Sequence, residues 1–498
     1  EDLQNATLDD VKEFYKKWYT PNNTVLTIAG DFNPEETKAW VEKYFNEIPR
    51  GEEVTPLQKR KVELSETKRL VYEDNFARLP QLTITWPTVA NYEEDSYALD
   101  VLANYLSKGK GAPLNTLLID EKELTSNVSM YHYGSELSGE LTLSVNAFAG
   151  KNLNEVLVSV NEALTKFELE GISQQDLDRI KAGQETRFYN GLSSVLGKGF
   201  QLAQYEIFAG DPAYITTDVE KILAVTKEDV QRVYETYIKG NNYIATSFVP
   251  KGQRELALSN SETAAVVEEK IIEGAEEGFD PSISATYQKT PSSFDRSKEP
   301  SYGASPEIEV PLVWKDSLSS GITVYGIESR EVPLVQFQIN LKGGLLLEHK
   351  EKTGVSNLLA NLLLKGTASK TTATLENAIE SLGANIYTYA TKESIVISGT
   401  TLAKNYKATI ELVQEILLEP RWDVREFDIL KQGTLSKLEQ QKANPNSIAQ
   451  VQFDKLLYGK DHILSNNILG TPASVKAITL SDVKTYYTNN ISPSITNI

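Results

Sequence analysis

The stretch TLDDVKEFYKKWYTPNNTVLTIAGDFNPEE, from Thr7 to Glu36, decides the fold because its opening phrase occurs three times in the chain. The phrase is a Thr with an Asp three residues later, followed by an aromatic helix face and then by Pro or Gly near Asn. It begins at Thr7, Thr226 and Thr479. A Thr that caps a helix and an acid that returns the hydrogen bond predict a capped helix start. One such helix is commonplace, whereas three copies of the whole phrase indicate an internal repeat.

Two further phrases repeat independently of the first. LANYLSKG at Leu102–Gly109 returns as LANLLLKG at Leu359–Gly366, and Leu177–Gly183 matches Phe427–Gly433 at its hydrophobic, Asp, Lys and Gly positions. The three repeated phrases occur in the same order in both copies and at nearly the same spacing. The second and third copies are therefore expected to share one order of structural elements.

Alternating apolar residues predict half-buried strands within each copy. Examples are Leu141, Leu143, Val145 and Ala147, and likewise Val335, Phe337, Ile339 and Leu341. Pairs of such strands are followed by long helical stretches. This pattern predicts an α+β fold of repeated domains, each a mostly antiparallel sheet with helices packed on one face.

The repeats divide the 498-residue chain into four segments. Residues 1–55 are expected to be the C-terminal tail of a first domain, and residues 60–250 a complete second domain. Residues 251–308, rich in Ser, Pro, Glu and Gly, are expected to form a linker, either solvated or docked. Residues 309–498 are expected to be a third domain, truncated at its C-terminal end. The first segment is too small to bury a core of its own, so its apolar residues should be covered by other protein. The covering protein is expected to be either missing domains of the same protein or a second chain that exchanges this segment.

The composition excludes several classes of function. The formal charge of −19 argues against nucleic acid as a partner, because nucleic-acid binding needs clustered Lys and Arg. The chain has no cysteine, which excludes disulfides and thiolate metal sites and fits either cytosol or periplasm. No apolar stretch is long enough to span a bilayer.

The three histidines do not form a metal site by spacing. His132, His349 and His462 are far apart in the sequence, and none has a second His or Cys at ligand spacing. Because a zinc site needs three or four convergent ligands, structural or surface roles are expected for all three. We therefore expect no catalytic, metal-binding or cofactor-binding residue in this chain.

These repeated phrases resemble the pitrilysin, insulin-degrading enzyme and processing-peptidase family of inverzincin zinc metallopeptidases. The resemblance rests mainly on Thr7–Glu36, on Gly343–Gly354 and on the run LLLKGT from Leu362 to Thr367. It implies two halves, each a pair of similar domains, joined by a linker and closing around a chamber that holds peptides. It also implies that residues 1–55 end a catalytic-type domain and that the second and third domains are non-catalytic and degenerate.

The family's zinc helix carries the motif H-x-x-E-H, which places two His on one helix face and a general-base Glu between them. On the resemblance, the first domain's copy of this helix and the zinc ligands would precede Glu1. The matching positions inside this chain are Asp100, Ala103 and Asn104 in the second domain, and Asn357, Ala360 and Asn361 in the third. Neutral amides are poor zinc ligands and Ala is no base, so both helices are interpreted as structural versions of the site.

Other functional residues of the family are replaced as well. Lys437 lies near the position where a third ligand is wanted, and Ile119 and Ser126 stand where a substrate-gripping Arg and Tyr would. That Arg–Tyr pair is expected in a fourth domain beyond Ile498.

The resemblance implies part of a zinc-dependent metalloendopeptidase, with this chain supplying chamber wall and linker but no zinc site. The alternative is a non-catalytic peptide-binding or scaffold subunit of the same family, and the residues leave open whether the protein is an enzyme. The expected partners are a peptide or small-protein substrate and the missing N- and C-terminal domains. The compartment stays open, with the bacterial periplasm or cell envelope favoured.

Overall fold

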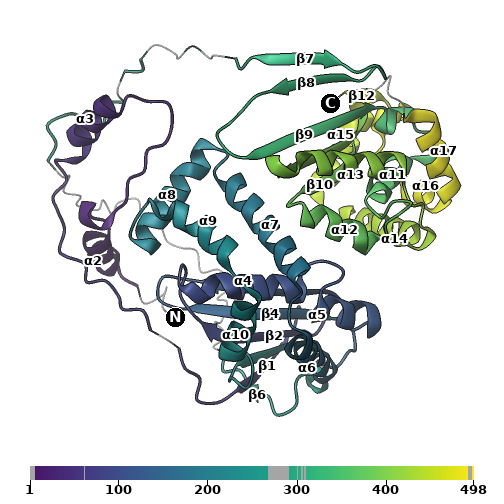
Figure 1. The fold of residues 1–498 in the computed structure, drawn as a ribbon. Coiled ribbons are helices and arrows are strands. Elements are labelled where there is room, and N and C mark those ends of the chain that lie inside the picture. Colours follow the sequence, from purple (N-terminus) through teal and green to yellow (C-terminus); the bar gives the residue numbers. More distant parts are fainter. Residues whose placement is uncertain are drawn as a thin grey trace.

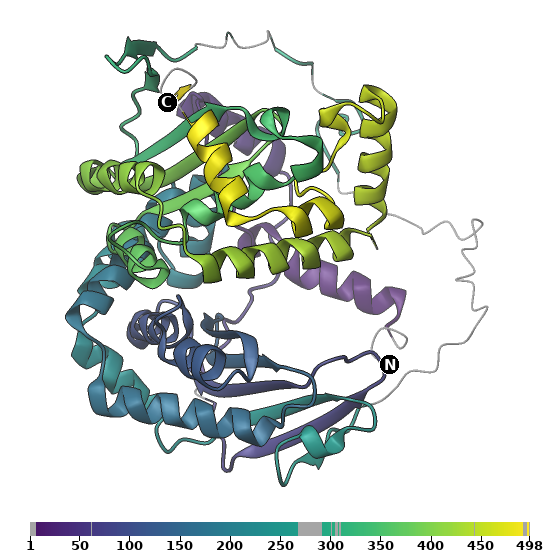
Figure 2. The same ribbon diagram turned by 90° about the vertical axis from the view of Figure 1, so that its right-hand side faces the viewer.

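The computed structural model describes residues 6–60, 62–266, 291–299, 301–303, 307, 310–442, 444–491 and 496–497. These residues form two units, each built on a six-stranded sheet with helices packed against it (Figure 1). Figure 2 shows the two units one above the other, with the C-terminal unit uppermost. The predicted α+β class is confirmed.

The first sheet has the strand order β3-β4-β2-β5-β1-β6. Its strands are β1 (Lys68–Asp74), β2 (Gln81–Thr88), β3 (Thr125–Gly134), β4 (Gly139–Ala147), β5 (Ile244–Pro250) and β6 (Glu262–Thr263). Only the pairs β1–β5 and β1–β6 are parallel. Burial alternates along β2, where Leu82, Ile84 and Trp86 are buried, because successive side chains point to opposite faces of a sheet.

Helices cover the buried face of this sheet. The helices that contact its strands are α4 (Glu94–Ser107), α5 (Pro113–Asn115), α6 (Leu153–Glu170) and α10 (Lys227–Tyr237). Helix α7 (Gln174–Gly191) packs against α4, and α8 (Val195–Ala209) and α9 (Tyr214–Ala224) pack against α7, farther from the sheet (Figure 1). A single hydrophobic cluster joins residues of α4, α6, α7 and α10 to the inward side chains of the strands. The burial of this apolar surface is the main stabilising contribution to the unit.

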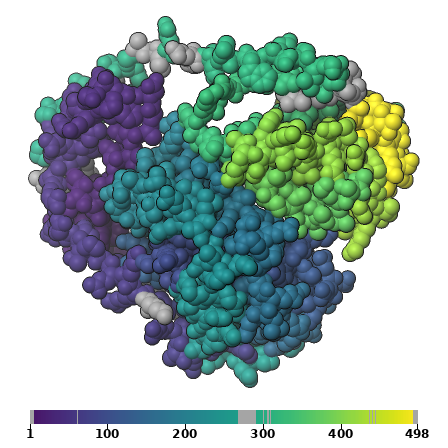
Figure 3. All heavy atoms as spheres, viewed as in Figure 1, coloured from purple at the N-terminus to yellow at the C-terminus, as the bar shows by residue number. Residues whose placement is uncertain are grey.

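The second sheet repeats this topology, in the order β10-β11-β9-β12-β8-β7. Its strands are β7 (Val313–Ser317), β8 (Thr323–Ile327), β9 (Leu334–Lys342), β10 (Asn385–Ala390), β11 (Ser394–Leu402) and β12 (Thr496–Asn497). Strand β12 is parallel to β8 and antiparallel to β9, as β5 is to β1 and β2. Strand β12 has two described residues, whereas β5 has seven. A groove of about 1300 Å³, lined by β7, β8 and β9, lies beside β12 at the opening seen in Figure 3.

The helices of the second unit follow in matching order. They are α11 (Val355–Leu363), α12 (Thr372–Ser381), α13 (Tyr406–Leu418), α14 (Val424–Gln441), α15 (Pro445–Tyr458), α16 (Pro472–Ala477) and α17 (Leu480–Asn490). Leu102 on α4 and Leu359 on α11, which begin the repeated LAN phrases, are both fully buried in the cores of their units. The predicted repeat is thus confirmed in topology and in the placement of this helix.

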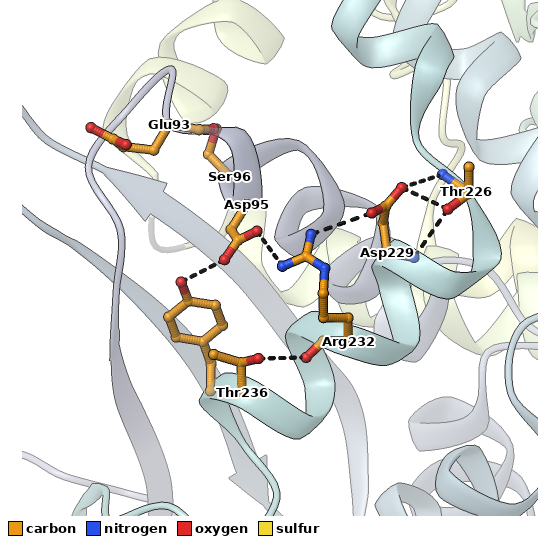
Figure 4. A network of polar contacts seen from close by, with 8 residues as sticks. Glu93, Asp95, Ser96, Thr226, Asp229, Arg232 and Thr236 are labelled. Atoms are coloured by element: carbon orange, nitrogen blue, oxygen red, sulfur yellow. Dashed lines mark hydrogen bonds and ion pairs between the residues drawn. The ribbon is translucent and has the colours of Figure 1, made fainter.

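The repeated Thr phrase forms the same local structure in all three places. Thr7, Thr226 and Thr479 each cap a helix, α2 (Leu8–Trp18), α10 and α17 respectively, and each makes a complete capping box with the Asp three residues on. Figure 4 shows the box of α10 joined to the first turn of α4.

The two N-terminal helices pack differently from their counterparts. Helix α2 and helix α3 (Pro34–Phe45) contain no buried residue, and Phe14 and Trp40 are 57% and 51% exposed. Figure 1 shows them apart from both sheets. Part of the expected linker contacts α3, where the Phe294 ring meets the Tyr44 ring edge-on at 5.0 Å between centroids. This contact lies in the described piece 291–299, and whether the linker as a whole is docked or solvated stays a prediction.

The expected linker boundary at 251 is too early. After β5 the chain makes a 3-10 turn at Arg254–Leu256, buries Ala257 and Leu258 in the first core, and adds β6 beside β1. The polar composition of 251–263 hid this short apolar anchor. Residues 267–290 of the expected linker lie outside the described residues.

Candidate functional site

The positions that match the family's zinc motif in the first unit lie on α4. Ala103 is buried, and Asp100 is half exposed. The side-chain amide of Asn104 donates to the backbone carbonyl of Asp100 at 2.8 Å. The amide is therefore used to bond its own helix.

The equivalent positions in the second unit repeat this arrangement on α11. Ala360 is fully buried, and the side-chain amide of Asn361 donates to the backbone carbonyl of Asn357 at 2.7 Å. The same bond across one helical turn occurs at the same repeat position in both units. Ala has no donor atom, neutral amides are poor zinc ligands, and Asp100 is the one charged residue of the two sets, so neither set by itself supplies the three or four ligands that zinc requires.

The histidines lie in three separate places. The side chain of His132, on β3, is only 3% exposed, and its Nδ1 lies 3.4 Å from a carboxylate oxygen of Asp100. His349 is exposed in a charged turn, and His462 stacks on Tyr458 with 5.9 Å between ring centroids. The contact between His132 and Asp100 was missed from the sequence because the two residues belong to different elements of the repeat.

The remaining candidate positions do not add ligands to the zinc-motif positions of α4 or α11. Lys437 is exposed on α14, Ile119 packs against the first core, and Ser126 is exposed on β3. Within the described ranges, no group of three or more His, Cys, Asp or Glu residues is arranged to hold a metal ion. That this chain binds no zinc nevertheless stays a prediction for experiment.

One buried carboxylate does shape the repeated helix of the second unit. Glu348 accepts hydrogen bonds from the backbone N–H groups of Gly354 and Ser356, at 2.7 and 2.8 Å, and from the Ser356 hydroxyl. It thus caps the N-terminus of α11, where partial positive charge favours an anion. Burial raises the pKa of Glu348 to about 7, against the opposing effect of these hydrogen bonds. The role of Glu348 is structural, and no periodicity in the sequence marks it.

Among the helices of the described ranges, none is both long and apolar enough to cross a membrane.

Comparison with known proteins gives two family matches, one in each half of the chain. The family model described as the peptidase M16 inactive domain matches residues 5–184, and the one described as insulinase (peptidase family M16) matches residues 326–471. The first match runs from α2 through most of α7. The second runs from the end of β8 to the start of α16.

Individual relatives agree with these matches. The chain is 27% identical over 247 residues to the zinc protease PqqE of Helicobacter pylori, a match covering 48% of this chain and 54% of that protein. It is 24% identical over 188 residues to the mitochondrial-processing peptidase subunit beta of Saccharomyces cerevisiae, covering 36% and 39% respectively. The chain thus spans about half the length, or less, of the curated relatives it matches.

A solved structure of the periplasmic protease PqqL from Escherichia coli aligns with 99% of this chain and 55% of that one, at 15% identity and a TM-score of 0.43. The repeated sheets and the two separate matches to models of one family lead to a single assignment. The chain belongs to peptidase family M16, the pitrilysin and insulinase family of zinc metallopeptidases.

Proposed function

We propose that this chain is part of a zinc-dependent metalloendopeptidase that hydrolyses peptides or small proteins inside a clamp-like chamber. The chain supplies chamber wall and linker, with residues 1–55 ending a catalytic-type domain. The zinc ligands and the general base belong to another part of the protein. One observation supports placing the zinc site outside this chain. At the positions that match the zinc motif on α4 and α11, Asn104 and Asn361 bond the backbone of their own helices, and Ala103 and Ala360 are buried.

A second candidate function is a non-catalytic peptide-binding or scaffold subunit of the same family. The description of the family model that matches residues 5–184 as an inactive domain favours it.

We further propose that the protein works in the bacterial periplasm or cell envelope, on a peptide or small-protein substrate. Support comes from the description of one structural relative, PqqL, as a periplasmic protease. Fractionation of the source cells, followed by immunoblotting for this chain, tests the compartment.

Two measurements test the proposed function. Elemental analysis of the 498-residue chain after dialysis should find no stoichiometric zinc, and one tightly held zinc per chain would contradict the proposal. The whole protein should cleave a quenched fluorogenic peptide, and a chelator should abolish the cleavage. Saturable peptide binding without any cleavage would instead support the scaffold function.

A further inference from the structure

A small pocket lies at the junction of the two units. It has a volume of about 250 Å³ and is enclosed by the C-terminal end of α4, by α7, and by the turn that joins α12 to β10. Its polar lining consists of Asn104, Lys108, Arg179, Arg187, Asn190, Glu380 and Asn385. The pocket is thus lined by three cations, three amides and a single carboxylate.

One of the three cations is neutralised within the pocket. Arg179 forms ion pairs with Glu380 across the junction and with Asp176 on its own helix, the latter at 3.1 Å. For Lys108 and Arg187, by contrast, the described residues provide no side-chain hydrogen bond and no ion pair within 4.0 Å. Two positive charges are therefore left without a direct counter-charge.

The two cations also affect each other. Desolvation by the pocket walls, together with the nearby Arg187 and Arg179, holds the pKa of Lys108 below its usual range, although Glu380 opposes this. Holding like charges together in a partly desolvated pocket costs free energy, which a bound anion offsets. The chain as a whole carries a formal charge of −19, so a local excess of positive charge is not a general property of its surface.

A neighbouring pocket of about 390 Å³ extends this site along α4. The two pockets share Asn104, Lys108 and Arg187, and the second also reaches Asp100 and His132. A ligand anchored at the two cations therefore has room to continue over the helix. The planar guanidinium of Arg187 suits two parallel hydrogen bonds to one oxyanion, and the Lys108 ammonium adds a point charge.

We propose that Lys108 and Arg187 form a binding site for an oxyanion, a carboxylate or a phosphate group, at the junction of the two units. The ligand occupies the enclosed pocket beside the Arg179–Glu380 pair, with the amides of Asn190 and Asn385 as further donors. The bound oxyanion is either a free ion from solution or the C-terminal carboxylate of a peptide.

Calorimetric titrations at low salt test the site. The ligands are inorganic phosphate and a pair of peptides of one sequence, with a free and with an amidated C-terminus. Saturable binding of phosphate alone identifies phosphate as the source of the oxyanion, and binding of the free-acid peptide but not of its amide identifies a carboxylate. Arg187→Gln and Lys108→Gln should each weaken binding by about tenfold or more, since each removes a charge-assisted contact.

Matched variants control for the change in net charge. Arg78→Gln, in the exposed loop between β1 and β2, and Lys227→Gln, at the first turn of α10, should leave the affinity unchanged. Arg187 and Lys108 line the pocket but each also keeps exposed surface, so the variants should fold like the parent, which thermal unfolding verifies. The proposal is overturned if none of the ligands binds saturably, or if the pocket variants bind as tightly as the controls.

Discussion

The hydroxyl of Thr186 donates a hydrogen bond of 2.6 Å to the backbone carbonyl of Gly383, which joins α7 of the first unit to the turn after α12 of the second. Both the donor side chain and its partner are buried. Gly383 has a φ of +60°, and a Cβ at this position would lie 2.7 Å from the carbonyl oxygen of Ala182. Close packing between the units therefore depends on a residue without a side chain.

Replacing Gly383 by Ala should loosen this junction. We expect Gly383→Ala to lower the free energy of unfolding by roughly 1–3 kcal/mol, because the new Cβ both clashes and disfavours a positive φ. Urea titration measures the loss. Gly433→Ala on α14 is the control: its Cβ meets no atom within 4 Å, and Ala in a helix interior should stabilise by about 0.5–1 kcal/mol. Equal stability of Gly383→Ala and the parent would show that α7 and the turn are not in close contact.

The buried Glu348 should make stability depend on pH. Its pKa is raised from 4.5 to about 7 in the folded chain, so the folded state holds this proton more tightly than the unfolded state does. The resulting stabilisation is fully present below about pH 4.5 and is lost as the pH rises through about 7. We expect a contribution on the order of 3 kcal/mol to disappear over this window, measured by urea unfolding at a series of pH values.

The variant Glu348→Gln isolates this contribution. Gln keeps a side-chain oxygen that accepts a backbone N–H bond but does not titrate, so the variant should lose the slope in this window. Glu351→Gln, an exposed neighbour in the same turn, should keep the slope. An identical pH dependence in parent and Glu348→Gln would rule out Glu348 as the titrating group.

Asp95 links the capped start of α10 to α4, as Figure 4 shows. Its carboxylate accepts hydrogen bonds from Arg232 at 2.6 Å and from the Tyr237 hydroxyl at 2.7 Å. Asp95→Ala should destabilise the first unit by about 1–2 kcal/mol, since it leaves the half-buried Tyr237 hydroxyl without its partner. Glu94→Ala, which removes the exposed neighbouring acid, should change stability by less than about 0.5 kcal/mol. A thermal unfolding series would reject this link if the two variants proved equally stable.

Strand β8 should exchange its amide hydrogens faster than its repeat counterpart β1. Strand β1 pairs with β5 over its whole length, whereas among the described residues β8 pairs with β12 only at Asn497 and otherwise borders the groove on that side. Amides that lack a stable partner strand open more readily. Hydrogen exchange read by mass spectrometry should therefore show early deuteration at 323–327 and late deuteration at 68–74. Equal protection of the two segments would contradict the open groove.

Local features were the most predictable part of this fold. The capping boxes at Thr7, Thr226 and Thr479 follow from a Thr and an Asp three residues apart, a pattern that needs no tertiary information. The repeat then predicted the buried helices at Leu102 and Leu359, because equivalent sequences form equivalent elements.

Contacts between distant segments were not predictable in the same way. The bond from Thr186 to Gly383 and the approach of His132 to Asp100 depend on how units and elements are brought together, which no single phrase encodes. The anchoring of Ala257 and Leu258 was hidden by the polar residues around them. The charge of the whole chain likewise concealed the cations at the junction, since net charge says nothing about local distribution.

The buried alanines at positions 103 and 360 limit which substitutions these two helices tolerate. Restoring the H-x-x-E-H pattern on α4 or α11 would require Glu at a site enclosed by the hydrophobic core, together with two His substitutions. Introducing a carboxylate there, before any metal could compensate its charge, would destabilise the unit. A single substitution of either Ala by Glu should therefore cost stability before any metal site is complete.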